Sequence, residues 1–189
     1  SVTSVALIRP KSNKRRSCQV CLCRFLHLSP RMKTVVLNPA NIERILRRIS
    51  YQIVESTEGD LEITLIGMMP RGAWVADQLV SHLSEISKVR VKRLDVDADD
   101  VETLSAESSA VKDKEVVLVD DIINSGVSMM RVAGAIMQFE PRCLITVSLV
   151  DRKHRKFPIK SDFTGLSLAT TMQEHLRLEI KPKPTIYLQ

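Results

Sequence analysis

The chain has 189 residues, an apolar fraction of 44% and a formal net charge of +6. A chain of this length buries enough surface for one domain with a full hydrophobic core. No apolar run approaches the length of a membrane-spanning helix, which excludes a membrane protein of the helical class. We therefore expect a soluble protein with a single folded domain and no membrane partner.

The positive charge is concentrated at the start of the chain. Residues 1–31 contain seven Lys or Arg and no Asp or Glu, so this leader carries +7 and the remaining residues together carry −1. The body therefore has no overall attraction for a polyanion, and RNA is a permitted but not a favoured partner. We expect residues 1–31 to be a basic unstructured leader and residues 32–189 to be the folded domain.

The leader also holds three of the four cysteines, close to a histidine. These residues are Cys18, Cys21, Cys23 and His27. No strand or helix pattern surrounds them, so a structural zinc site is not expected. An acid-free leader is typical of an organelle transit peptide, or of translated sequence upstream of a start at Met32. The body has only Cys143, which gives no disulfide framework and makes the reducing cytoplasm the default location.

Regular structure is expected shortly after the leader. A short apolar stretch, Thr34–Leu37, precedes Asn38, a typical helix N-cap, and Pro39 suits the first helical position. The helix should run to about Glu55 with one apolar face against a sheet and its arginines largely elsewhere. Those arginines are Arg44, Arg47 and Arg48. A solvated face is the simplest interpretation, and a site for an anionic partner is the alternative.

A strand, a glycine-containing loop and a helix come next. Leu61–Ile66 is apolar and predicts a core strand, and Ala73–Leu83 has the periodicity of a helix. Between them, Gly67 and Gly72 would let the backbone approach an anion closely, and Arg71 offers a fixed guanidinium fork. The motif is weak by itself, because an ordinary strand-to-helix turn with a surface arginine has the same composition.

An acidic stretch follows the next expected strand, Val89–Val96. Between Asp95 and Glu107 there are six acidic residues and no Lys or Arg. Unless metal ions bridge it to a ligand, this charge would oppose a phosphate-rich transition state instead of stabilising it. The stretch therefore weighs against efficient phosphate chemistry nearby.

The most informative segment is a buried strand followed by a polar loop and a helix. Val116–Val119 is typical of a strand in a parallel sheet and is expected to end at Asp120 and Asp121. Open α/β sheets bind ligands at the carboxyl ends of their strands. Backbone N–H groups of the loop Asn124–Ser128, before the helix Met129–Phe139, would hold a phosphate. The two acids suit sugar hydroxyls, or a metal ion that carries phosphate oxygens.

Residues 116–128 resemble the thirteen-residue phosphoribosyl-pyrophosphate (PRPP) signature of type I phosphoribosyltransferases. Both threonines of that signature are serines here, which keeps the hydroxyl groups. The glycine-containing loop resembles the family's pyrophosphate-binding loop, Gly-x-x-x-Arg-Gly. The resemblance implies catalytic roles for Asp120, Asp121 and Arg71, with Mg²⁺ held at the two aspartates through PRPP or water. The residues it implies for PRPP binding are Asp120, Asp121, Asn124, Ser125, Gly126, Val127, Ser128, Arg71 and Gly72.

The last part of the chain resembles one particular branch of this family. Pro141–Val150 predicts a strand, and Asp151–Gly165 resembles the segment of bifunctional pyrimidine operon attenuator/uracil phosphoribosyltransferases that leads into a hood over the base. The resemblance covers about Lys33 to Gln189. It implies an α/β type I phosphoribosyltransferase fold, with a central parallel sheet flanked by helices and a small C-terminal hood, in a homo-oligomer. The implied base-binding residues are Asp162, Phe163, Thr164, Gly165, Leu166, Arg152 and His154.

Asn124 bears on the choice of base. Purine phosphoribosyltransferases resemble this loop but place an aspartate there to exchange a proton with the base, and an amide cannot take that proton. The resemblance thus implies transfer of 5-phosphoribosyl from PRPP to a nucleobase, uracil first, in nucleotide salvage. The alternative is a catalytically weak regulatory protein that senses nucleotide or PRPP. The acidic stretch favours this alternative, because type I enzymes commonly have a longer, flexible loop with a basic residue there.

Overall fold

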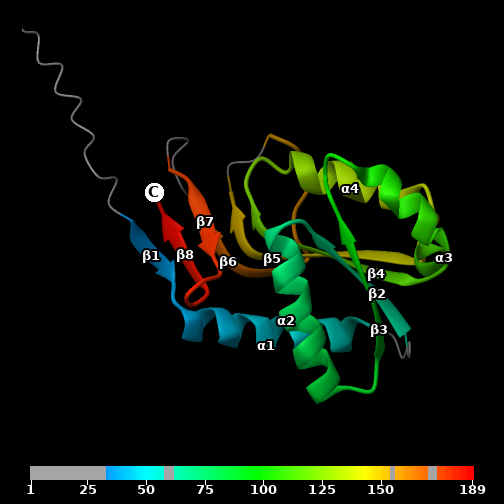
Figure 1. The fold of residues 1–189 in the computed structure, drawn as a ribbon, viewed down its shortest axis with the longest axis horizontal. Coiled ribbons are helices and arrows are strands. Elements are labelled where there is room, and N and C mark those ends of the chain that lie inside the picture. Colours follow the sequence, from blue (N-terminus) through cyan, green and yellow to red (C-terminus); the bar gives the residue numbers. More distant parts are fainter. Residues whose placement is uncertain (1–32, 58–61, 154–155, 170–173) are drawn as a thin grey trace, which may run out of the picture. The chain divides into compact units, whose positions relative to one another are not determined.

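The computed structural model describes residues 33–57, 62–153, 156–169 and 174–189. They form a five-stranded sheet and a three-stranded sheet with helices packed around them (Figure 1). The helices are α1 (Pro39–Ser56), α2 (Arg71–Ile86), η1 (Val101–Glu107, a 3-10 helix), α3 (Ser108–Val111) and α4 (Val127–Met137). The strands are β1 (Thr34–Leu37), β2 (Glu62–Met68), β3 (Arg90–Val96), β4 (Glu115–Ile123), β5 (Cys143–Arg152), β6 (Phe163–Leu168), β7 (Leu176–Glu179) and β8 (Thr185–Leu188). The leader and its cysteine cluster lie outside the described residues.

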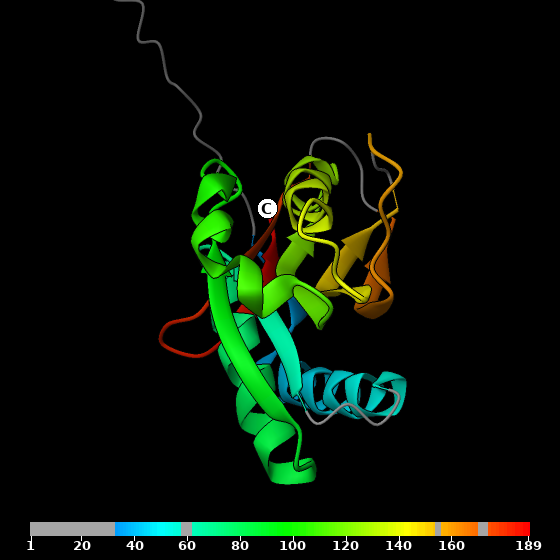
Figure 2. The same ribbon diagram turned by 90° about the vertical axis from the view of Figure 1, so that its right-hand side faces the viewer.

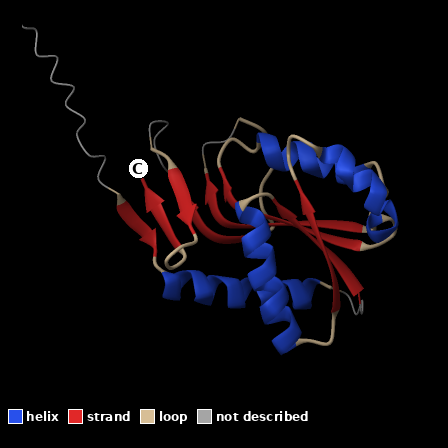
Figure 3. Ribbon diagram, viewed as in Figure 1, coloured by secondary structure: helices blue, strands red, loops and turns tan. Residues whose placement is uncertain are grey.

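The central sheet is parallel throughout, with the strand order β3-β2-β4-β5-β6. Strand β4 lies in the middle and is buried on both faces, as its apolar run predicts. Val117 and Val119 belong to a core with α1 and α2, whereas Val116 and Leu118 belong to a second core with α4 and η1. Figures 2 and 3 show helices on both sides of this sheet. The predicted α/β fold class is thereby confirmed.

Helix α1 begins where its sequence predicts. The Asn38 side chain accepts a hydrogen bond from the backbone N–H of Asn41 over 2.8 Å, and Pro39 occupies the first turn. This bond satisfies one of the N–H groups that have no acceptor within the helix. The buried face of the helix consists of Ile42, Leu46, Ile49, Ser50 and Ile53. The apolar side chains of this face join the first core.

The small sheet has the order β1-β8-β7, and both of its pairings are antiparallel. The first strand of the described chain thus pairs with the last one, so the hood is built from both ends of the folded part and is not purely C-terminal. Leu176, Leu178 and Ile186 of the hood are buried in the first core, which fixes the hood on the helix α1 side of the sheet. No helix in the described ranges combines the length and the apolar character that a membrane span needs.

One local prediction needs correction. Strand β4 does not end at the aspartates but continues to Ile123, because Ile122 and Ile123 are buried and pair with Val150 and Asp151 of β5. The acidic stretch Asp95–Glu107 runs from the end of β3 through η1, and Leu104 of η1 is buried in the second core.

Candidate active site

The paired aspartates lie within β4, three residues before its end. Asp120 pairs with Ser148 of the neighbouring strand, and its carboxylate accepts a hydrogen bond from the Asp121 backbone N–H over 2.8 Å. Asp121 is only 8% exposed, while Asp120 keeps part of its surface in contact with solvent. Two carboxylates are therefore held close together at the carboxyl end of the sheet, with little water around them.

Both carboxyl groups resist ionisation in the ligand-free protein. Burial, the charge of Asp121 and a hydrogen bond with it raise the pKa of Asp120 well above its usual value. Burial likewise raises the pKa of Asp121, although the bond to Asp120 and the charge of Arg71 oppose that rise. A buried pair of like charges is costly unless a cation or hydrogen-bond donors compensate it. The pair is thus prepared for a ligand that supplies such groups.

The donor set fits Mg²⁺ only in part. Two adjacent carboxylates are the hard oxygen ligands that Mg²⁺ prefers. In the part of the chain that the structure describes, no third His, Cys, Asp or Glu joins them to make a complete protein cage. The aspartates would therefore share the ion with water and with phosphate oxygens of a ligand, which is the usual arrangement for Mg²⁺ at phosphate sites.

The loop after β4 forms a small cradle at the start of α4. Gly126 has φ of 82° and precedes the first helical residue, a backbone conformation that glycine adopts without strain. The Val127 N–H contacts the Ser125 hydroxyl at 3.4 Å. The loop and the end of β4 line a pocket of about 70 Å³ that also includes Asp120. A helix N-terminus with exposed N–H groups attracts anions, so the cradle has the size and the polarity for a phosphate group beside a carboxylate.

Arg71 and Gly72 form the first turn of α2, two residues earlier than predicted. The Arg71 charge acts on both aspartates, because it lowers their otherwise raised pKa values. Gly72 is needed for packing: a Cβ there would lie 2.6 Å from the Val119 carbonyl oxygen of β4. Gly67 likewise lies against the backbone of α2, because an added Cβ at Gly67 would lie 2.7 Å from the Ala73 Cα. Close packing of α2 on the sheet thus brings Arg71 to the aspartates.

The predicted base-binding residues fall into separate places. Arg152 is buried at the end of β5, and its guanidinium donates to the Asn124 side-chain oxygen over 3.2 Å. It is therefore brought to the loop Asn124–Ser128, the predicted phosphate loop. Asp162 lies at the start of β6, where its carboxylate accepts bonds from the Thr146 N–H and hydroxyl over 2.8 and 2.9 Å. Phe163 pairs with Val147. His154 is not among the described residues.

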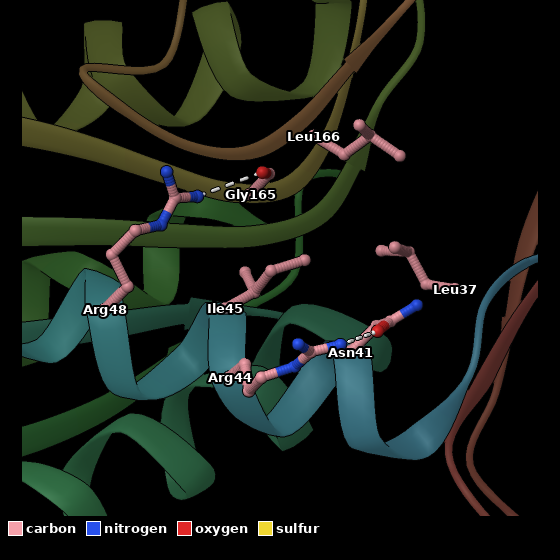
Figure 4. A pocket seen from close by; sticks show the side chains of 7 residues that line it. All are labelled: Leu37, Asn41, Arg44, Ile45, Arg48, Gly165 and Leu166. Carbon is pink, nitrogen blue, oxygen red and sulfur yellow. Dashed lines mark hydrogen bonds between the residues drawn. The ribbon is translucent and has the colours of Figure 1, made fainter.

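Strand β6 also borders a second pocket, on the far side of β5 from the aspartates. This pocket of about 290 Å³ opens between α1 and β6 (Figure 4). Arg48 closes one side of it by donating to the Thr164 and Gly165 carbonyl oxygens over 2.8 and 2.9 Å. The residues that line the pocket are Leu37, Asn41, Arg44, Ile45, Arg48, Gly165 and Leu166. Strands β4 and β6 are two spacings apart, about 10 Å, so Gly165 and Leu166 stand away from the phosphate loop.

The acidic stretch is tied to helix α4, whose start forms part of the cradle. Arg131 of α4 donates to the Ala98 carbonyl over 2.9 Å and forms an ion pair with Asp99 at 2.6 Å. One turn of helix separates Arg131 from Ser128. These two contacts join the start of the stretch, just before η1, to α4.

Sequence reasoning missed the contacts made on the phosphate loop by the connection between β5 and β6. The backbone N–H groups of Lys156 and Phe157 donate to the Ser125 carbonyl, and Ile159 lies against Gly126. These residues belong to the segment Asp151–Gly165, for which the resemblance implies roles of other residues only. A backbone contact of this kind has no signature in residue type or spacing, so no signal in the sequence pointed to it.

The chain resembles known phosphoribosyltransferases both in sequence and in fold. Residues 34–178 match the phosphoribosyl transferase domain family. The bifunctional protein PyrR of Enterococcus faecalis is 32% identical over 163 residues, covering 80% of this chain and 92% of the relative. PyrR of Clostridium acetobutylicum is also 32% identical, covering 79% and 92%. A crystal structure of a hypoxanthine-guanine phosphoribosyltransferase from Bacillus anthracis superposes with a TM-score of 0.67 at 18% identity, over 82% of this chain and 98% of that one.

Proposed function

The chain belongs to the phosphoribosyltransferase family, and from the site described above we propose that it transfers the 5-phosphoribosyl group of PRPP to uracil in nucleotide salvage. The observation that carries this proposal is the arrangement of two adjacent carboxylates, one buried and one half-buried, next to a phosphate-sized cradle. Carboxylates accept bonds from ribose hydroxyls, and the cradle suits the 5-phosphate of the same sugar. The PyrR relatives support a pyrimidine base, as does the amide of Asn124.

Each part of the site has one task in this proposal. The loop Ser125–Ser128 holds the 5-phosphate, and Asp120 with Asp121 holds the ribose hydroxyls and shares Mg²⁺ with the ligand. Arg71 and the first turn of α2 bind the pyrophosphate that leaves. Mg²⁺ would supply positive charge to that leaving group. Because none of the described side chains of the site is placed as a general base, the rate gain would come from positioning and charge stabilisation.

The direct test is product formation. Protein, PRPP, uracil and Mg²⁺ should yield UMP and pyrophosphate in equal amounts, and hypoxanthine or guanine in place of uracil should yield little nucleotide. A clear preference for a purine base would contradict the assignment of the base. A cytoplasmic location and a homo-oligomeric state belong to the same proposal, and size-exclusion chromatography with light scattering measures the oligomeric state.

A second candidate function is a sensor of PRPP or nucleotide with little turnover. The specific observation in its favour is the acidic stretch, whose last part forms η1 and whose Ala98 and Asp99 are bound to α4 by Arg131. An acidic element cannot bring positive charge over a leaving pyrophosphate, whereas binding does not need it. Tight PRPP and UMP binding without UMP formation would favour the sensor.

RNA binding is predicted to be weak and to depend on the leader. Helix α1 carries three arginines close together, Arg44, Arg47 and Arg48, and two of them are engaged within the protein: Arg44 with Asn41, and Arg48 with β6. A chain that begins at Met32 should therefore bind an RNA hairpin only weakly at physiological salt, as filter binding would measure.

The control for RNA binding is a pair of exposed cations elsewhere. If the shortened chain bound tightly, and Arg44→Ala with Arg47→Ala abolished binding while Lys88→Ala with Arg90→Ala did not, the prediction would be wrong. Helix α1 would then be an RNA-binding surface.

The raised pKa values predict a proton signature of binding. A carboxyl group whose pKa is raised by folding stabilises the folded state fully at pH values below its usual pKa of 3.8. That stability is lost as the pH rises from there through the raised pKa of the folded state. Since Mg²⁺ and ribose hydroxyls need the ionised pair, Mg²⁺–PRPP binding should release protons within that window. Calorimetry in two buffers of different ionisation enthalpy should give different apparent heats, and Asp120→Asn should reduce the difference. Equal heats at every pH would contradict the prediction.

A further inference from the structure

The connection between β5 and β6 holds the phosphate loop from outside. The backbone N–H groups of Lys156 and Phe157 both donate to one acceptor, the Ser125 carbonyl oxygen, over 3.1 and 3.2 Å. A carbonyl oxygen has two lone pairs, so both bonds are compatible with one acceptor. The two segments are distant in sequence, and their contact is therefore a feature of the folded site.

This contact fixes the direction of the next N–H group in the chain. The Ser125 carbonyl and the Gly126 N–H belong to the same planar peptide unit, in which they point in opposite directions. Two bonds on the oxygen therefore determine where the Gly126 N–H points. It points away from Lys156 and Phe157, and Gly126 itself lines the pocket formed by the loop and the start of α4.

The same turn confines the glycine that follows. A Cβ at Gly126 would lie 2.8 Å from Ile159 Cγ2 and 3.4 Å from the Phe157 carbonyl oxygen. Ile159 itself packs on the second core, and its N–H donates to the Phe157 carbonyl over 2.9 Å. The turn is thus anchored in the core and forms a wall against the loop. Two residues before Gly126, the Asn124 side chain accepts a hydrogen bond from Arg152 over 3.2 Å.

We propose that the turn Lys156–Ile159 is a positioning element for the phosphate loop, which aims the Gly126 N–H at the 5-phosphate of the ligand through the Ser125 carbonyl. The proposal rests on the proposed function, because it takes the loop to be the 5-phosphate site. The turn acts through its backbone and touches no reacting atom. Holding the loop in its binding geometry before the ligand arrives avoids part of the ordering cost of binding.

The test compares Phe157→Pro with Phe157→Ala. Both variants lack the ring, which is exposed in the protein, but only proline also lacks the N–H. Phe157→Pro should bind UMP and PRPP about tenfold more weakly than Phe157→Ala, the factor expected for one hydrogen bond. The loss should be the same for both ligands, because both carry the 5-phosphate. If the proline variant does not fold, Lys156→Pro against Lys156→Ala removes the other donor.

Lys160→Pro is the control for proline itself. In the described part of the chain, the Lys160 N–H has no acceptor, and its carbonyl, which accepts the Thr146 hydroxyl over 3.0 Å, is retained in proline. This variant should bind both ligands like the original protein. If the Phe157 and Lys156 proline variants bound UMP as tightly as their alanine partners, the proposal would be overturned.

A second measurement does not need PRPP. In the ligand-free protein, hydrogen exchange of the segment 124–130 should be about tenfold faster in Phe157→Pro than in Phe157→Ala, because the loop loses an external bond. Should the unaltered protein bind neither PRPP nor UMP, the proposed function fails while this comparison still tests the turn. Unchanged exchange in both proline variants would overturn the positioning role.

Discussion

Asp121→Asn is expected to raise the melting temperature of the ligand-free protein and, at the same time, to weaken PRPP binding by about ten- to a hundredfold. The first effect follows from burial, which raises the pKa values of both aspartates, and from the neighbouring like charge: removing one charge relieves the pair. The second follows because the amide keeps the shape but loses a charge-assisted hydrogen bond worth roughly 1.5 to 3 kcal/mol. Thermal unfolding and calorimetric titration measure the two effects.

Asp113→Asn is the matched control for this prediction. Asp113 is exposed and lies just before β4, at the opposite end of the strand from the site. Its φ of 56° is one that asparagine tolerates. The control removes the same charge and should leave PRPP affinity unchanged. A fall in the melting temperature of Asp121→Asn would mean that the two aspartates stabilise the ligand-free fold. That result would contradict the view that their burial and like charges cost stability.

The opposite signs matter because a purely structural aspartate would behave differently. A carboxylate that holds the fold together loses stability when it is replaced, and any loss of ligand affinity accompanies that damage. A site residue kept at a cost to stability gives the reverse, as active sites commonly do. The pair Asp120 and Asp121 therefore allows function and fold to be separated in one variant.

The parts of the fold that sequence predicted are those governed by neighbouring residues. The start of α1 depends on Asn38 and on an N–H three residues later, so residue type and spacing were sufficient. Burial of β4 on both faces followed from four apolar residues in a row. The end of β4 was placed wrongly because it depends on β5: Ile122 and Ile123 continue the ladder with Val150 and Asp151, and no local pattern identifies that partner.

Glycines show the same limit within the site. The sequence predicts that Gly67 and Gly72 allow an anion to approach the backbone, which stays a prediction. The structure gives both a packing role, since a Cβ at Gly72 would meet the Val119 carbonyl and one at Gly67 would meet Ala73. A glycine in the sequence permits a close approach, but only the folded chain shows whether there is one and to what: an added Cβ at Gly134 would have no neighbour within 4 Å. The bonds from Lys156 and Phe157 to Ser125 were unpredictable for the same reason.

Arg71→Ala is expected to weaken PRPP binding by about ten- to a hundredfold and UMP binding by less than about threefold. Only PRPP carries the pyrophosphate that we assign to the first turn of α2, and a charge-assisted contact to phosphate contributes roughly 1.5 to 3 kcal/mol. UMP shares with PRPP only the ribose and the 5-phosphate, which other residues hold. Arg71 also lowers the raised pKa values of the aspartates, so the titrations belong well above the folded pKa values, where this indirect effect is smallest.

Two further variants sharpen the Arg71 experiment. Arg71→Lys keeps the charge but not the planar fork, and should recover part of the PRPP affinity without changing UMP. Arg90→Ala removes an exposed arginine at the start of β3, the end of the sheet away from the site. This variant should leave the affinity for both ligands unchanged. Equal losses of PRPP and UMP in Arg71→Ala would show that the arginine acts through the aspartates rather than on the pyrophosphate. Arg71→Ala could also weaken PRPP more than UMP in a protein that makes no UMP. That result would mean that the site binds PRPP as proposed, while the acidic stretch prevents turnover.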